Sequence, residues 1–257
     1  MKRIFLSISL LTALVFCGCA AVTHDTITQT STIDALLAGA YDGSMTCAEL
    51  LKNGDLGIGT FNRLDGEMII LDGEIFQVKA DGFIYEPARS TRTPFASVCY
   101  FKPDNCFSIQ AESDYNAVQK KIDEAVPNKN VFCAVKIHGK FTSMKTRSVP
   151  AQTKPYPPLT EVTKNQPVFN FENVEGTIVG FRCPEFVKGV NVPGYHFHFI
   201  NDNFTKGGHV LDFVLSEGTC QTDICDRYLL ILPKGGEGLE NIDLSKDRSE
   251  ELQAVEK

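Results

Sequence analysis

The stretch "PGYHFHFINDNFTKGGHVLDF", residues 193–213, holds three of the chain's five histidines and indicates how the second half folds. His196 and His198 are two positions apart, so in a β-strand both imidazoles project from the same face of the sheet. The turn-forming run "NDNFTKGG" separates them from His209, which opens the apolar run "HVLDFVL". A strand, a loop and a returning strand would therefore bring the three rings together, and the two glycines before His209 leave its backbone free to bend.

The neighbouring segments are also short and apolar, which favours a β-rich second half. "FENVEGTIVGFRCP", "YHFHFI", "HVLDFVLSEGT" and "DRYLLILP" are interpreted as short strands, and a mostly antiparallel barrel or sandwich is expected from them. The charged end "LSKDRSEELQAVEK" is expected to form a helical tail.

The first half combines a β-meander with one clear helix. Asp-Gly pairs at Asp65, Asp72 and Asp81 separate apolar runs, which predicts strands joined by tight turns. "YNAVQKKIDEAV" predicts a helix that ends at a proline. "NVFCAVKIHGKFTSMKTRSV" is interpreted as two strands that turn at His138-Gly139.

A proline-rich segment, "PAQTKPYPPLTEVTKNQPVF", is expected to mark a domain boundary because it cannot continue a helix or a central strand. The predicted organisation is a signal peptide over residues 1–19, a Thr-rich tether over 20–32, an N-terminal domain over 33–150 and a C-terminal domain over 151–257.

The N-terminus predicts export. "MKRIFLSISLLTALVFCGCAAV" has two positive charges, an apolar run too short to span a bilayer comfortably, and then small residues. Its "FCGC" ends like a bacterial lipobox, which would make Cys19 a lipid-bearing first residue; ordinary cleavage after Ala20 is the alternative. The chain is thus expected to be exported, as a membrane-anchored lipoprotein or as a periplasmic or extracellular protein.

The net charge limits the classes of binding partner that are expected, and the cysteine content bears on whether disulfides form. A net charge of -7 argues against a nucleic-acid partner, which calls for clustered Lys and Arg. Export permits disulfides, and two spacings, Cys99 with Cys106 and Cys220 with Cys225, suggest local bridges. The alternative is that the seven cysteines beyond the signal are mostly small buried hydrophobic residues: Cys47, Cys99, Cys106, Cys133, Cys183, Cys220 and Cys225.

The three clustered histidines suggest a catalytic zinc site. Neutral imidazoles bind Zn²⁺ well, and three protein ligands leave a fourth position for water or substrate. Closed structural zinc sites favour cysteine, and no Cys-x-x-Cys accompanies these histidines. Histidines on a strand without a metal are the alternative, and His24 and His138 fit that alternative better.

The histidine region within "GTIVGFRCPEFVKGVNVPGYHFHFINDNFTKGGHVLDF" resembles the zinc-binding region of the alpha-acetolactate decarboxylases. The resemblance extends to "GIGTFNRLDGEMIILDGE", to "HGKFTSMKTRSVPAQTKPYPPL" and to the acidic tail. It implies a β-rich α/β (α+β) fold with an N-terminal mixed β-sheet domain and a C-terminal β-barrel domain. It also implies a homodimer, and decarboxylation of acetolactate to acetoin with Zn²⁺ as cofactor.

The same resemblance implies roles for individual residues. His196, His198 and His209 would be the zinc ligands. The implied reacting-site side chains are Glu67 of "DGEM", Arg147 of "KTRSVP", Thr60 of "GTF" and Glu256 of the tail. Glu250 and Glu251 remain alternatives for the tail carboxylate, since a one-turn slip would exchange them.

These residue types suit the chemistry. Acetolactate offers two oxygens that can chelate a metal, and the enediolate formed on loss of carbon dioxide is stabilised by a Lewis acid. Arg147 can hold a carboxylate or an oxyanion, and Glu67 can protonate the carbanion-like carbon. The alternatives are another exported zinc enzyme, such as a hydrolase, and a non-catalytic metal- or ligand-binding lipoprotein.

Overall fold

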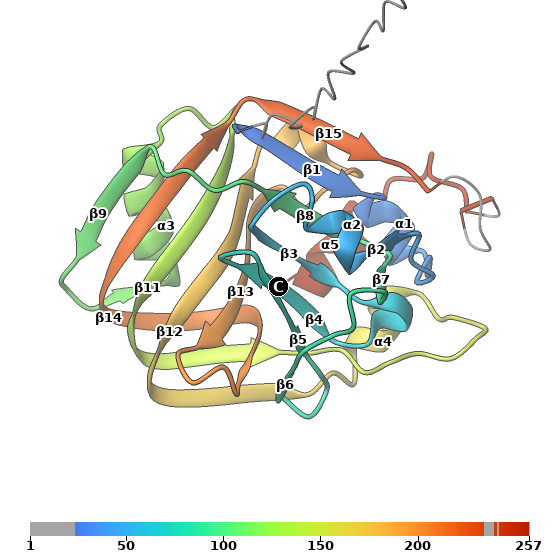
Figure 1. The fold of residues 1–257 in the computed structure, drawn as a ribbon, viewed down its shortest axis with the longest axis horizontal. Coiled ribbons are helices and arrows are strands. Elements are labelled where there is room, and N and C mark those ends of the chain that lie inside the picture. Colours follow the sequence, from blue (N-terminus) through green and yellow to red (C-terminus); the bar gives the residue numbers. More distant parts are fainter. Residues whose placement is uncertain (1–23, 234–238, 241, 257) are drawn as a thin grey trace, which may run out of the picture.

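Two β-sheets form the framework of the computed structural model, which describes residues 24–233, 239–240 and 242–256 (Figure 1). The predicted signal peptide, with Cys19 and Ala20, lies outside these residues. The first sheet is mixed, because its outermost pair, β15 and β1, is parallel while its other pairs are antiparallel. Its strands are, in spatial order, β15 (Arg227–Ile231), β1 (Thr26–Thr30), β8 (Ala96–Cys99), β3 (Leu56–Thr60), β4 (Glu67–Leu71), β5 (Glu74–Val78) and β6 (Ile84–Tyr85).

The second sheet is antiparallel and closes on itself. Strand β14 pairs with both β11 and β13, and β12 lies between those two, so four strands form a barrel-like ring. Figure 1 shows the long strands bending strongly along their length. The sheet contains β9 (Asn105–Ile109), β10 (Ser113–Asp114), β11 (Phe132–Arg147), β12 (Val168–Cys183), β13 (Gly194–Asn201) and β14 (Gly207–Cys225). The β-rich α+β class, with one mixed and one antiparallel barrel-like sheet, is therefore confirmed.

The helices are short and cover the sheets. They are α1 (Ile33–Leu37), α2 (Cys47–Leu50), α3 (Tyr115–Ala125), α4 (Leu159–Thr163) and α5 (Ser249–Glu256), and a small two-stranded sheet pairs β2 (Met45–Thr46) with β7 (Arg92–Thr93). Helix α3 forms where the apolar spacing predicts it and buries Val118 and Ile122 against the barrel. No helix within the described residues is long and apolar enough to cross a membrane.

The tight turn predicted at Asp72-Gly73 is confirmed, whereas Asp65-Gly66 and Asp81-Gly82 lie in longer connections between strands. Asp72 and Gly73 both have positive φ (52° and 82°), as a two-residue turn between β4 and β5 requires. Gly66, before β4, has φ 87°, and a Cβ there would collide with the carbonyl of Val78. A larger residue at Gly66 would therefore displace the start of β4.

The turn predicted at His138-Gly139 is wrong. These residues lie in the middle of β11, a single strand of 16 residues with a partner strand on each side. Gly139 lies opposite Gly176 of β12 and Gly218 of β14, so three glycines align across the sheet. Glycines aligned in this way permit close approach and bending in a barrel wall, and this explains a turn-like signal inside a strand.

The predicted tether and domain boundary also differ from the structure. Residues 26–30, in the predicted tether, form β1, and Ile27 is fully buried. The boundary at residue 150 does not separate the sheets, because β9, β10 and β11 precede it and belong to the second sheet, while β15 returns to the first. Residues 105–147 therefore pack with the C-terminal half of the chain.

Neither predicted local disulfide forms. Cys220 and Cys225 lie five residues apart on the continuous strand β14 and so point to opposite faces. Cys99 is buried in the first sheet, whereas Cys106 is exposed on β9 of the second. All seven cysteines among the described residues are free thiols and all except Cys106 are buried, which fits the alternative that most of them act as small hydrophobic residues.

Candidate active site and metal centre

Three strands of the barrel bring two histidines and Arg147 into one row. His198 on β13 lies directly opposite His209 on β14, which in turn lies opposite Arg147, the last residue of β11. His196, two residues before His198, projects from the same face, as the alternation along β13 predicts. Gly208 has φ 137°, and a Cβ there would collide with the backbone carbonyl of Arg147, so the approach of β14 to β11 beside His209 requires glycine.

The first sheet contributes a carboxylate and orients one histidine. Glu67 is the first residue of β4, where it pairs with Thr60 across the hairpin. The Nδ1–H of His198 donates a 2.8 Å hydrogen bond to the backbone carbonyl of Met68, which leaves Nε2 as the lone-pair nitrogen. That Nε2 is buried without a hydrogen-bond partner and lies 3.6 Å from a Glu67 carboxylate oxygen.

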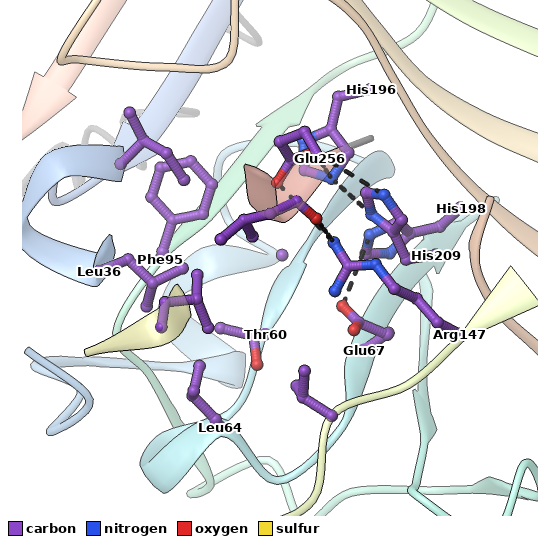
Figure 2. Close-up of a pocket in the computed structure, with 15 residues that line it drawn as sticks. Leu36, Thr60, Leu64, Glu67, Phe95, Arg147, His196, His198, His209 and Glu256 are labelled. Carbon is purple, nitrogen blue, oxygen red and sulfur yellow. Dashed lines mark hydrogen bonds and ion pairs between the residues drawn. The ribbon is translucent and has the colours of Figure 1, made fainter. Parts of the chain in front are cut away.

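The last helix completes the cluster (Figure 2). Helix α5, red in Figure 1, packs with α1 and α4 and places Glu256 over the histidines. One Glu256 oxygen lies 3.8 Å from Nε2 of both His196 and His209, and the other lies 3.9 Å from the Arg147 guanidinium. Glu250 is exposed and Glu251 is half-exposed, so Glu256 is the acidic residue of the tail that the structure brings to the histidines.

Arg147 is buried and held in place by two hydrogen bonds. Its Nη1 donates to Gln166 Oε1 at 2.8 Å, and its Nη2 donates to the Val255 carbonyl at 2.9 Å. The Nε–H has no hydrogen-bond partner. A buried, permanently charged donor without a partner is costly unless it binds an anion, so Arg147 is suited to hold a negatively charged ligand.

Thr60 lines the pocket beside Glu67, but its hydroxyl already has a partner. The hydroxyl donates a 2.7 Å hydrogen bond to the Gly66 carbonyl, and the Thr60 carbonyl accepts one from Thr93. The hydroxyl thus stabilises the turn that leads into Glu67. Thr60 shapes the site through this turn.

The three histidines are held in the neutral form. Burial, and then the charge of Arg147, lower the pKa of His196 to about 3. Burial likewise lowers the pKa of His198 and of His209 well below the usual range, and the neighbouring rings and Arg147 add to this effect. Neutral imidazoles keep the lone pairs that a metal requires.

The carboxyl groups of Glu67 and Glu256 have pKa values above their usual range, so burial favours their neutral form as well. Burial raises the pKa of Glu67 to about 7; Arg147 partly opposes this shift and Glu256 adds to it. Burial also raises the pKa of Glu256, again opposed by Arg147. A carboxyl group with a pKa near neutrality exists in both protonation states at working pH, as a proton donor or acceptor must.

The histidine cluster fits a divalent metal ion. One nitrogen from each of His196, His198 and His209 lies within 4.8 Å of the others; His198 and His209 are buried, and the His196 side chain is only 10% exposed. The partnerless Nε2 of His198 is the sharpest sign, because a buried acceptor without a hydrogen bond calls for a ligand. The Glu67 and Glu256 carboxylates lie 3.6–3.8 Å from the Nε2 atoms of these histidines, so three neutral nitrogens and two carboxyl groups border one small volume.

An apolar wall faces this cluster. The pocket is a small cavity of about 40 Å³ with an open mouth, and its wall consists mainly of Ile33, Leu36, Leu64, Phe95, Val149 and Leu159. Sequence reasoning missed this wall, and it also missed Gln166 and the Met68 carbonyl that orient Arg147 and His198. No local pattern marks these groups, because each reaches the site from a distant segment.

The comparisons with known proteins agree on one family. The family model for alpha-acetolactate decarboxylase matches residues 27–246. An alpha-acetolactate decarboxylase of Methanosarcina mazei is 47% identical over 233 residues, which cover 91% of this chain and 81% of that protein. One from Bacillus subtilis is 43% identical over 225 residues, which cover 86% of this chain and 88% of that protein. A crystal structure of alpha-acetolactate decarboxylase from Bacillus subtilis superposes with a TM-score of 0.88 and 40% identity over 90% of this chain and 99% of that chain.

Proposed function

This chain belongs to the alpha-acetolactate decarboxylase family of carboxy-lyases, and from that premise we propose that it converts acetolactate to acetoin and carbon dioxide at a zinc ion held by His196, His198 and His209. The observation that carries the metal proposal is the buried trio of neutral histidines, in which His198 Nε2 has no partner. The trio lies in the same pocket as one buried arginine and two carboxyl groups with raised pKa.

The histidines would hold the metal without reducing its charge. A zinc ion held by these residues would supply Lewis acidity, which would stabilise the negative charge that develops on the substrate oxygens as carbon dioxide is lost. The hydrogen bond from His198 Nδ1 to Met68 fixes the ring so that Nε2 faces the site.

Arg147 binds the anionic end of the substrate. Its guanidinium is anchored by Gln166 and by the Val255 carbonyl, so little motion is needed when substrate enters. Its free Nε–H faces no protein acceptor and is available to a carboxylate or an oxyanion. Because the carboxylate leaves as neutral carbon dioxide and its negative charge moves to the remaining oxygens, a fixed guanidinium beside the site can stabilise the oxyanion that develops.

Glu67 delivers the proton that completes the reaction. Once carbon dioxide has left, the electron-rich carbon must take a proton on one face to give a chiral product. The Glu67 carboxyl lies 3.6 Å from His198 Nε2, at the edge of the position that the substrate would occupy. Its pKa of about 7 lets it hold a proton near neutral pH and release it to the carbon.

Glu256 closes the site from the opposite side. It lies within 4 Å of His196, His209 and Arg147, so its charge balances the guanidinium when the site contains no anion. The Val255 carbonyl beside it anchors Arg147. The C-terminal helix therefore orders the arginine as well as supplying a second carboxyl group.

The decisive experiment is an assay of the purified chain with racemic acetolactate. Acetoin and carbon dioxide should form in equal amounts, with one acetoin enantiomer in excess. A panel of esters and amides serves as the comparison, since a zinc hydrolase would cleave one of them and leave acetolactate intact. Binding of acetolactate without turnover would instead indicate a ligand-binding protein.

Export, lipid attachment and dimerisation complete the proposal. The basic and apolar start of the sequence supports export, and its Cys19 supports a lipid anchor. Cell fractionation of wild type and Cys19→Ser tests both, because the variant should move to the soluble fraction. The resemblance to the family supports a homodimer, which light scattering of the purified chain would detect as twice the chain mass.

A further inference from the structure

Two buried cysteines meet where the two sheets join. Cys99 is the last residue of β8 in the first sheet, and Cys225 is the last residue of β14 in the second. Both side chains are fully buried. Their sulfur atoms and a carboxylate oxygen of Asp223 all lie within 4.8 Å of one another. Residues more than a hundred positions apart in the sequence thus place two free thiols side by side.

The surroundings of the pair favour neutral sulfur. The hydrogen bond with Cys225, and then burial, raise the pKa of the Cys99 thiol, and burial raises the pKa of Asp223 to about 6. One Asp223 oxygen accepts a 2.9 Å hydrogen bond from the Lys102 backbone, and the other is buried without a partner. Two thiolates beside this carboxylate would place three negative charges in an apolar region, which is strongly unfavourable.

That charge count argues against a metal ion in this cluster. A divalent ion bound by two thiolates and a carboxylate would leave a net negative charge in the core, and structural zinc sites take four ligands. The cluster in the described residues offers three. A covalent sulfur–sulfur bond is neutral, and its formation removes two protons that the buried site would otherwise have to hold.

We propose that Cys99 and Cys225 form a disulfide that joins the ends of β8 and β14. The two thiols lose two protons and two electrons, and a disulfide oxidant such as oxidised glutathione accepts them and becomes two glutathione thiols. Because the folded pair is buried, the bond forms while the chain folds. The inference rests on the proposed export of the chain, since a reducing cytosol would keep both thiols free.

The bond would stabilise the crossing between the sheets. The chain passes directly from Cys225 into β15, which pairs with β1 at the edge of the first sheet. A bridge from Cys225 to β8, on the other side of β1, fixes this crossing within the sheet that supplies Glu67. Because it closes a loop of more than a hundred residues, it should restrict the unfolded chain strongly.

The test is to refold the reduced chain in a mixture of reduced and oxidised glutathione, block the remaining thiols under denaturing conditions, and map linked peptides by mass spectrometry. A peptide pair joined through Cys99 and Cys225 is expected. The Tm should exceed that of protein refolded under fully reducing conditions by on the order of 5–15 °C.

Three variants separate the bond from ordinary packing. Cys99→Ala and Cys225→Ala should each abolish the difference in Tm between oxidised and reduced protein, whatever their effect on absolute stability. Cys220→Ala removes a buried thiol from the core of the barrel and should retain the difference. Free thiols at both positions after oxidative refolding, a bridge through Cys133 or Cys183, or equal Tm values would each overturn the proposal. None of these outcomes bears on acetoin formation, which is measured separately.

Discussion

Replacing Glu67 by glutamine should remove the proton donor while preserving the metal site. Glutamine is nearly isosteric with glutamate and keeps an acceptor oxygen for the backbone hydrogen bond from Val149. It does not exchange a proton at working pH. The proposal assigns the zinc to the three histidines, and glutamine keeps an oxygen in place of the Glu67 carboxylate, 3.6 Å from His198 Nε2, so the Glu67→Gln protein should bind about as much zinc as wild type and unfold at a similar temperature.

The size of the expected loss follows from the role of the carboxyl. Its pKa of about 7 gives a substantial protonated fraction near neutral pH, so wild type has a donor in place at the start of each turnover. General acid catalysis is typically worth about 100- to 10,000-fold in rate. That factor corresponds to about 3–5 kcal/mol of barrier, and it should appear in kcat more than in KM.

Steady-state kinetics with acetolactate, together with metal analysis of the same preparation, measures both quantities. Glu251→Gln is the matched control, because Glu251 lies on α5 half-exposed and away from the pocket, and it should retain wild-type turnover. A Glu67→Gln enzyme that keeps a third of wild-type kcat would remove Glu67 from the mechanism. Glu256, tested by the same substitution, would then become the preferred donor.

Three further predictions concern the metal, the arginine and a buried carboxyl. His198→Ala should lose most of the bound zinc, while His24→Ala, at an exposed histidine outside the clusters of possible metal ligands, should keep it; equal zinc contents would contradict the ligand assignment. Arg147→Lys should keep the positive charge but lose one of the two hydrogen bonds that anchor the guanidinium. We therefore expect kcat/KM to fall at least about tenfold while the zinc content is unchanged. Near-normal kinetics would count against a role of Arg147 in holding an anion. Burial raises the pKa of Asp223 to about 6 in the folded chain. The stabilisation that protonated Asp223 gives is therefore complete at pH values below the pKa it has in the unfolded chain, and it is lost as pH rises through the pKa it has in the folded chain. Asp223→Asn should therefore gain about 1–2 kcal/mol over wild type in urea unfolding near pH 8, and much less near pH 4; an equal difference at both pH values would refute this reasoning.

The part of the site that depends on local sequence could be predicted. Alternation along β13 places His196 and His198 on one face, and the turn residues before His209 return the chain beside them. These features depend on the period of a strand and on turn chemistry, which a short window contains. The same holds for the tight turn at Asp72-Gly73.

The rest depends on pairings between distant segments. Arg147 meets His209 through the register of β11 on β14, and Glu67 arrives from a different sheet, so only the resemblance to a family could indicate them. Strand β1 has a polar, Thr-rich sequence that resembles a tether until its parallel pairing with β15, some 200 residues away, is known. At Gly139 a local turn signal misleads because the glycine bends a long strand instead of ending it.

The central claim is that a zinc ion held by three histidines is required for decarboxylation. Titrating metal-free protein with zinc while acetoin formation is measured tests it most directly. We expect no acetoin without metal and a rate that rises in proportion to added zinc until about one ion per chain is bound, as a single three-histidine site implies. Full activity in the metal-free protein, or no activity when the site is saturated with zinc, would contradict the account.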